Sequence, residues 1–237
     1  MRLIENVYQT SGVIYGTNSS TYCIDTSKGL VLIDAGFSEK QYDVMRFRRK
    51  QDDLGTKKIR DVFLTHSHFD HAGNSWLLQQ NGAKVYVGAD DAEALEKADE
   101  RTLSDLFGRK FHAFTPDGKV RDGQTFDYGN TQLTVLEHPG HTEGTISILA
   151  ETNGKKILFA GDIFVLKACN PADELQPEIG WTGGPDYNGK KNMETFRKLK
   201  ELPPVDLVAP GHGSIYFGDS RKLFEILYHL AEKEAQQ

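Results

Sequence analysis

The sequence predicts an α/β (α+β) protein with a four-layer sandwich, in which two sheets lie inside and helices lie outside. Three observations lead to this prediction. Strand-like runs are separated by helix-like runs, the pattern occurs in two similar halves, and 237 residues suit one sandwich domain over residues 1–237. The sequence shows no internal repeat and no low-complexity linker, so we expect one sizeable core.

The first half is predicted to begin with a meander of strands and then to alternate between helices and strands. Apolar and β-branched residues dominate the strand runs, and glycine or polar residues separate them. The predicted strands are 13–15, 20–24, 30–33, 59–64 and 84–87, and the predicted helices are 38–51, 71–81 and 89–101.

The second half repeats the strand-rich pattern and ends in helices. Strands are predicted from residue 120 to residue 159, followed by a helix over 191–201, a strand over 206–209 and a closing helix over 219–233. The stretch 164–190 is rich in Gly and Pro. A loop of this length inside a compact domain is usually functional, so we predict that it forms a rim over a site.

One stretch of the first half combines three imidazoles and a carboxylate at the spacing H-x-H-x-D-H. It holds His66, His68, Asp70 and His71, directly after a predicted buried strand. His66 and His68 are two residues apart, so on a continuing strand they face the same way. Imidazole and carboxylate are the ligands that Zn²⁺ and similar ions prefer. The stretch therefore predicts the floor of a two-metal site.

Three further side chains that can bind metal follow apolar runs, each beside a glycine. They are His141, Asp162 and His212. Glycine lets the backbone bend sharply, which places such a side chain at the mouth of a sheet. The candidate ligands of one metal are His66, His68 and His141, those of the second are Asp70, His71 and His212, and Asp162 is the candidate bridge.

The remaining histidines and one aspartate need separate interpretations. His112, His138 and His229 lie outside the pattern, and an isolated histidine is usually a structural or surface residue. His138 is close to His141 in sequence and is also a candidate for supporting a ligand. Asp34 follows the strand run 30–33, where it either forms a simple turn or bonds the backbone near the metal loop.

With P-G-H-T, G-D and G-H-G in order behind H-x-H-x-D-H, the chain resembles the metallo-β-lactamase-fold superfamily of metallohydrolases. The resemblance covers nearly the whole chain and implies the metallo-β-lactamase fold, with metals at one edge between the sheets. In this chain all seven ligand positions of the dinuclear type are filled. The resemblance also favours a supporting role for Asp34. It implies two divalent ions, with Zn²⁺ expected first and Fe²⁺ or Mn²⁺ as alternatives.

Differences from particular branches of that superfamily narrow the substrate. Asp162 stands where the class B β-lactamases carry Cys or Ser, and a bridging carboxylate is more typical of thioesterases, lactonases and phosphodiesterases. His68 stands where the flavin-linked diiron oxidoreductases carry Glu. Val165 stands where the lactonases of acyl-homoserine lactones carry Tyr.

The nearest local likeness is to hydroxyacylglutathione hydrolase (glyoxalase II). It rests on residues 139–142 and 161–164 and on Cys169. Pro171 replaces the basic residue that grips glutathione in that enzyme, and only 25 residues follow His212, so its glutathione-binding tail is lacking. We therefore expect a different specificity.

The expected function is a dinuclear hydrolase that uses a metal-bridged hydroxide on an ester, thioester or lactone. Asp70 is expected to orient the hydroxide and move its proton. The alternatives are a mononuclear iron oxygenase of the persulfide dioxygenase type, a phosphodiesterase and a weak β-lactamase. Candidate substrate-binding residues are Phe164, Lys167, Trp181 and Tyr187, each with ordinary packing or solvation as the alternative.

Composition and charge limit the classes of binding partner that we expect. A formal charge of −6 and a pI near 5.8 disfavour a nucleic-acid surface, which needs clustered Lys and Arg. No window has the apolar length of a membrane span or of a signal peptide. Two cysteines do not suggest a disulfide framework. We expect a cytoplasmic protein with a small-molecule substrate and no membrane partner, and a homo-oligomer stays open.

Overall fold

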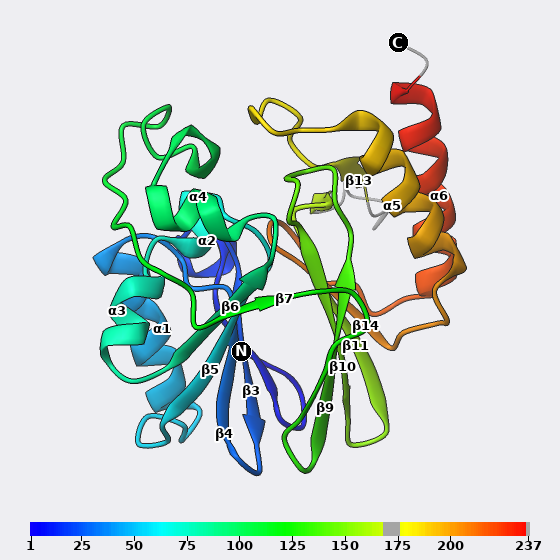
Figure 1. The fold of residues 1–237 in the computed structure, drawn as a ribbon. Helices are drawn as coiled ribbons and strands as arrows, with labels where there is room; N and C mark the ends of the chain where they lie inside the picture. Colours follow the sequence, from blue (N-terminus) through cyan, green and yellow to red (C-terminus); the bar gives the residue numbers. More distant parts are fainter. Residues whose placement is uncertain (168–175, 236–237) are drawn as a thin grey trace.

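Two β-sheets stack face to face, with helices on both outer faces (Figure 1). A computed structural model describes residues 1–167 and 176–235. Within these residues the first sheet has seven strands in the order β1-β2-β3-β4-β5-β6-β7, and the second has five in the order β14-β11-β10-β9-β8. This arrangement confirms the predicted αβ/βα sandwich.

The first sheet and its helices are formed by the chain up to residue 120. The strands are β1 (Arg2–Ile4), β2 (Val7–Ser11), β3 (Thr21–Thr26), β4 (Gly29–Ile33), β5 (Ile59–Leu64), β6 (Lys84–Gly88) and β7 (Gly118–Val120). The helices are α1 (Glu39–Gln51), α2 (Phe69–Ala72), α3 (Ser75–Gln80) and α4 (Ala92–Lys97), with the 3-10 helices η1 (Val13–Tyr15) and η2 (Glu100–Thr102).

The second sheet and its helices follow. The strands are β8 (Thr125–Asp127), β9 (Thr131–Glu137), β10 (Ile146–Thr152), β11 (Lys155–Gly161) and β14 (Leu207–Pro210), with the hairpin β12 (Phe164–Lys167) and β13 (Gln176–Ile179). The helices are α5 (Gly189–Glu201) and α6 (Ser220–Glu234). No helix in the described part of the chain is long and apolar enough to cross a membrane.

Apolar side chains pack in three layers, because both sheets are covered on both faces. Strand β4 shows the alternation of a strand: Val31 and Ile33 face the second sheet, whereas Leu30 and Leu32 face the outer helices. The outer face of the second sheet packs against α5 and α6, where Phe196 is fully buried. Burial on both faces explains why these strands are continuous apolar runs in the sequence.

The predicted strand over 13–15 is wrong, since these residues form η1. Gly12 and Gly16 flank it with φ of 140° and 70°, which an extended strand does not adopt. Val13 and Ile14 are each 63% exposed, so their β-branched side chains do not enter the sheet. Strands β1 and β2, which we did not predict, fill that part of the first sheet instead.

Two predicted helices are each interrupted. The helix predicted over 71–81 is the pair α2 and α3, which Gly73 and Asn74 separate. The helix predicted over 89–101 is α4 followed by η2, because Ala98 turns the chain with a φ of 50°. By contrast, α1 begins as predicted, and the Ser38 side chain caps it by accepting from Gln41 N.

The stretch 164–190 is not all loop, because β12 and β13 pair as an antiparallel hairpin in which Phe164 lies opposite Ile179. The glycines and prolines of this stretch led us to predict a loop. Pro177 is nevertheless tolerated in β13, because that strand belongs to a short two-stranded sheet. Cys169 and Pro171, which entered the comparison with glyoxalase II, lie outside the described residues.

Strand directions bring the loops of interest to one edge. β10 runs antiparallel to β9 and β11, whereas β14 runs parallel to β11, so the end of β9 and the ends of β11 and β14 lie together. Two backbone bonds join this edge to the first sheet. Ile146 N donates to Thr65 O at 2.8 Å, and Ser20 N donates to Gly211 O at 2.7 Å. The loops after β5 and β14 therefore meet between the sheets.

Candidate metal centre

Seven side chains from four segments converge at this edge. The segment after β5 supplies four of them, and the others come from the β9–β10 loop, the end of β11 and the end of β14. Their nitrogen and oxygen atoms form three overlapping groups, within each of which all ligand atoms lie within 4.8 Å of one another. The groups are His66, His68 and His141; His66, His71 and Asp162; and Asp70, His71 and His212.

The two predicted ligand sets are both assembled. His141 Nε2 lies 3.1 Å from His68 Nδ1 in the three-histidine set. In the other set, His212 Nε2 lies 3.1 Å from Asp70 Oδ2 and 3.2 Å from His71 Nε2. Two compact sets of nitrogen and oxygen atoms therefore stand side by side.

Asp162 lies between these two sets. Its Oδ1 is 3.3 Å from His71 Nε2, and its Oδ2 is 3.2 Å from His212 Nε2. The same Oδ2 is 3.9 Å from His66 Nε2 and 3.9 Å from His141 Nε2. One carboxylate thus faces both sets of ligands.

The outward nitrogen of two candidate ligand histidines is held by a protein oxygen. His71 Nδ1 donates to Asp34 Oδ2 at 2.8 Å, and His141 Nδ1 donates to the backbone carbonyl of Trp181 at 3.0 Å. Such bonds fix the tautomer and the orientation of the ring. The Nε2 atom of each ring then faces the other candidate ligands.

Asp34 also holds the loop that follows β5. It adopts a φ of 60° and accepts from Thr65 N at 2.8 Å and from Thr65 Oγ1 at 3.0 Å. Because that hydroxyl donates to Asp34, it accepts from His66 Nδ1 at 3.0 Å. Asp34 therefore connects the rings of His66 and His71 to the end of β4.

The donor set fits divalent metal. His66 Nε2 and Asp162 Oδ1 are buried and have no hydrogen-bond partner among the described residues. Buried polar atoms are almost always satisfied, so an unpartnered pair at the same centre indicates a missing partner. Imidazole nitrogen and carboxylate oxygen are typical ligands of Zn²⁺, Fe²⁺ and Mn²⁺.

Electrostatics also favour a cation at this centre. Burial lowers the pKa of His71 and of His212, but the carboxylates that face them outweigh it, so the pKa of His71 lies well above its usual range and that of His212 rises to about 10. Burial and the neighbouring rings of His71 and His68 hold the pKa of His66 well below its usual range. The carboxylates thus attract positive charge, whether it is a proton or a metal ion.

Asp91 is a buried support that the sequence analysis missed. It is 1% exposed and accepts from Ser67 N, from Thr142 Oγ1 and from Gly144 N, each at 2.8 Å. Burial raises its pKa to about 6. Because Ser67 stands between two ligand histidines and Thr142 follows a third, Asp91 joins two ligand loops. Its position three residues after Gly88, at the end of a strand, was the available signal.

Among the candidate substrate-binding residues, the prediction for Phe164 needs correction. Lys167 and Trp181, by contrast, lie near the centre. Phe164 is fully buried between the second sheet and the outer helices, because it points into the core from β12. Lys167 lines a cavity with His212 and pairs with Glu178 at 2.6 Å. Trp181 is 47% exposed, and its ring centroid is 6.5 Å from that of His68.

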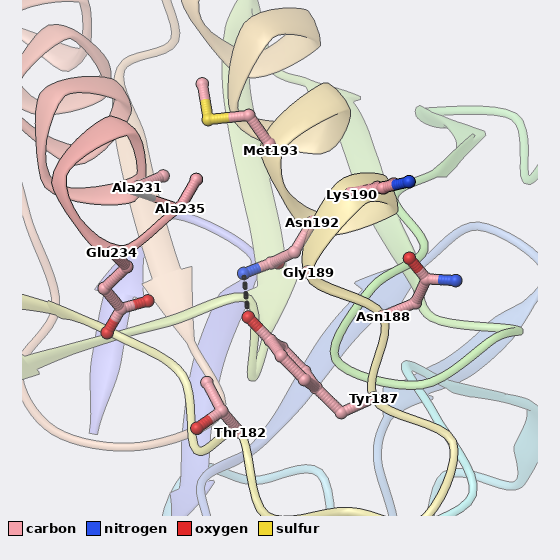
Figure 2. Close-up of a pocket in the computed structure, with 10 residues that line it drawn as sticks. All are labelled: Thr182, Tyr187, Asn188, Gly189, Lys190, Asn192, Met193, Ala231, Glu234 and Ala235. Atoms are coloured by element: carbon pink, nitrogen blue, oxygen red, sulfur yellow. Dashed lines mark hydrogen bonds between the residues drawn. The ribbon is translucent and has the colours of Figure 1, made fainter. Parts of the chain in front are cut away.

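Tyr187 and His138 lie apart from the ligand sets. Tyr187 lines a cavity of about 820 Å³ between the start of α5 and the end of α6, where its hydroxyl accepts from Asn192 Nδ2 at 3.5 Å (Figure 2). His138 is buried, and its Nδ1 bonds Ser147 Oγ at 2.9 Å. Within the described residues, neither makes a hydrogen bond to a candidate ligand.

Comparisons with known proteins identify the family of this chain. The family model of the metallo-beta-lactamase superfamily matches residues 14–212. An acyl-coenzyme A thioesterase of Bos taurus is 27% identical over 241 residues, which cover 92% of this chain and 80% of that protein. A hydroxyacylglutathione hydrolase of Cereibacter sphaeroides is 29% identical over 156 residues, which cover 65% of this chain and 49% of that protein.

Solved structures agree on the architecture. A subclass B3 metallo-beta-lactamase of Bradyrhizobium japonicum superposes with a TM-score of 0.77 at 22% identity, covering 100% of this chain and 92% of that one. At this identity the likeness concerns the fold.

Proposed function

We propose that this chain, which belongs to the metallo-beta-lactamase superfamily and is a metal-dependent hydrolase, uses two metal ions to hydrolyse a thioester, an ester or a lactone. The observation that carries the proposal is the position of Asp162 between two complete ligand sets. A site for one metal would need only one of these sets. Zn²⁺ is the expected metal.

Each set of side chains would hold one ion. His66, His68 and His141 would bind the first, the set of Asp70, His71 and His212 the second, and Asp162 would contact both. When bound, the two ions supply Lewis acidity that activates a water molecule and polarises the substrate carbonyl.

Asp70 is proposed as the residue that orients the attacking water and takes up its proton. Asn18 Nδ2 donates to Asp70 Oδ2 at 3.4 Å, and Ser19 Oγ donates to the backbone carbonyl of Asp70 at 2.5 Å. These bonds hold a carboxylate whose other neighbours are ligand imidazoles. A carboxylate in this position can accept a proton and return it to the leaving group.

An acyl group carried on a thiol is the favoured substrate. Among the relatives is an acyl-coenzyme A thioesterase that aligns with most of this chain. The Asp162 carboxylate also distinguishes the site from the Cys or Ser arrangement expected of class B β-lactamases. The Asp162 carboxylate therefore places β-lactams behind thioesters and esters, and the thioesterase relative is the reason to place phosphodiesters behind them as well.

Metal analysis combined with a substrate panel tests the proposal. Protein purified without added metal is analysed for Zn, Fe and Mn, and then assayed on thioesters, aryl esters, lactones, phosphodiesters and β-lactams. Two equivalents of metal with thioester or ester turnover are expected. One equivalent of iron with oxygen uptake would instead support the oxygenase alternative, and turnover restricted to phosphodiesters or β-lactams would move the chain to those classes.

A further inference from the structure

Exposed apolar side chains gather beside one of the two ligand sets. Val13 and Ile14 on η1 are each 63% exposed, and Phe217 is 59% exposed. All three line one cavity of about 570 Å³, together with Ile215 and the ligand His212. A contiguous group of exposed, large apolar side chains often marks a binding surface.

One wall of this cavity, η1, is fixed by its flanking turns. Tyr15 N donates to Gly12 O at 2.8 Å, and Gly12 N donates to Thr17 Oγ1 at 2.7 Å. Positive φ at Gly12 and Gly16 allows the chain to leave β2 and return toward β3. Val13 and Ile14 therefore project outward from a constrained turn rather than from a disordered tip.

The opposite wall continues directly from the ligand His212. Gly213 has a φ of 87°, and a Cβ there would lie 2.1 Å from Leu166 O. Ser214 N donates to the same carbonyl at 2.6 Å. This close contact with β12 sets the path of the chain that carries Ile215 and Phe217, so the wall and the ligand are held together.

Two of the polar side chains that line the cavity have partners within the protein. Lys167 is paired with Glu178 at 2.6 Å, which balances its charge. Asn18 bonds Asp70 at the end near the centre. The volume of the cavity lies within the range of small-molecule sites, about 300–1,000 Å³.

We propose that this cavity binds the acyl chain of the substrate, so that the enzyme selects apolar acyl groups. This inference rests on the proposed hydrolase function. The acyl carbon lies toward His212, and the chain extends between η1 and Phe217. Water adds across the acyl–sulfur or acyl–oxygen bond, which breaks to give a carboxylic acid and a protonated thiol or alcohol.

A second apolar group lies on the other side of the centre. The Phe107 ring centroid is 6.2 Å from that of Trp181, which stands beside His68. This group offers the alternative path for the acyl chain. The cavity at η1 is favoured because η1 and residues 213–217 line one defined volume together with the candidate ligand His212.

The test is a series of thioesters of one thiol whose acyl groups run from two to ten carbons. Each methylene that is buried should raise kcat/KM about 4-fold until the cavity is full. In the double variant Ile14→Ser, Phe217→Ser, each added methylene should leave kcat/KM nearly unchanged. Phe47→Ser is the matched control, because Phe47 is also 59% exposed but lies on α1 and lines a different cavity. It should keep the wild-type gain.

Binding to metal-free protein supplies a readout that does not depend on turnover. Wild type and Phe47→Ser should bind N-phenyl-1-naphthylamine, a neutral apolar fluorophore, and decanol should displace it. The double variant should bind the fluorophore at least 10-fold more weakly. Circular dichroism and urea unfolding of the double variant check that it is folded.

The outcomes separate this inference from the function on which it rests. If the metal-loaded enzyme turns over no thioester, ester or lactone, the proposed substrate classes are refuted. Turnover of the acetyl thioester without a gain for longer chains refutes only the acyl cavity. A gain that survives in the double variant but is lost in Phe107→Ser places the chain on the other side. A dimer that dissociates in the double variant, without any change in chain-length dependence, makes the patch an interface between copies and overturns the inference.

Discussion

Asp91→Asn tests whether the buried support between two ligand loops controls metal binding. Ser67 N and Thr142 Oγ1 both donate to Asp91 Oδ2, and Gly144 N donates to Oδ1. An amide replaces one acceptor oxygen with a donor, so at least one buried N–H or O–H group loses its partner. That loss destabilises the fold by about 1–3 kcal/mol.

An opposing effect comes from charge. Burial raises the pKa of Asp91 from 3.8 to about 6, so ionising it at neutral pH costs the native state about 3 kcal/mol, at 1.36 kcal/mol per pKa unit. The uncharged amide avoids this cost. We therefore expect the free energy of unfolding of metal-free Asp91→Asn to stay within about 2 kcal/mol of wild type.

Metal affinity should respond much more than stability. The broken bonds position the loops that carry His68 and His141, so the three-histidine set should lose about 10–100-fold in affinity. Zinc titration against a competing chelator measures this, with urea unfolding of the metal-free protein alongside. Asp90→Asn is the control, since Asp90 is the neighbouring residue but pairs on the surface with Arg121. Two tightly bound metals in Asp91→Asn, or equal weakening of both sets, would refute the reasoning.

Three further predictions concern the bridge, a glycine and a buried histidine. Asp162→Asn should lower metal stoichiometry and reduce turnover at least 10–100-fold; two retained metals with near-normal turnover would exclude a bridge. Gly211→Ala should lose metal, because a Cβ there would lie 2.0 Å from Asp162 Oδ1 and 2.8 Å from His71 Cε1, whereas Gly189→Ala, with no contact under 3.7 Å, should retain it. Burial lowers the pKa of His138 to about 3, so the unfolded chain takes up a proton first as the pH falls below 6.5. His138 should therefore contribute a fall in stability of about 2 kcal/mol between pH 7.5 and pH 5, which urea unfolding measures as the difference in pH dependence between wild type and His138→Asn.

The ligand pattern could be predicted because each element of it is local. A strand, a glycine and a side chain suited to metal follow one another within a few residues, and the parallel and antiparallel order of the strands brings them to one edge. The helix α1 could be predicted for the same reason, since Ser38 and the residues after it carry its start signal.

The features that escaped prediction depend on distant neighbours. Asp91 belongs to no motif, and its partners lie 24 to 53 residues away in the sequence. Val13 and Ile14 have strand propensity, but η1 holds them in solvent, and exposure is not visible in a short apolar run. Phe164 sits two residues after Asp162, yet the path of β12 turns it into the core rather than toward the ligands.

The distribution of the ligands over both sheets has a consequence for biosynthesis. His71 and His212 are separated by 141 residues, so at about 5–20 residues per second His71 leaves the ribosome roughly 7–28 s before His212. During that interval the set of Asp70, His71 and His212 stays incomplete, whereas the three-histidine set needs no residue of the last strand. Tight binding of an ion at the set that contains His212 would begin only when the final strand joins the second sheet, and such an ion would then resist separation of the two halves. Occupancy of that set in the cell would thus report that the last strand is in place.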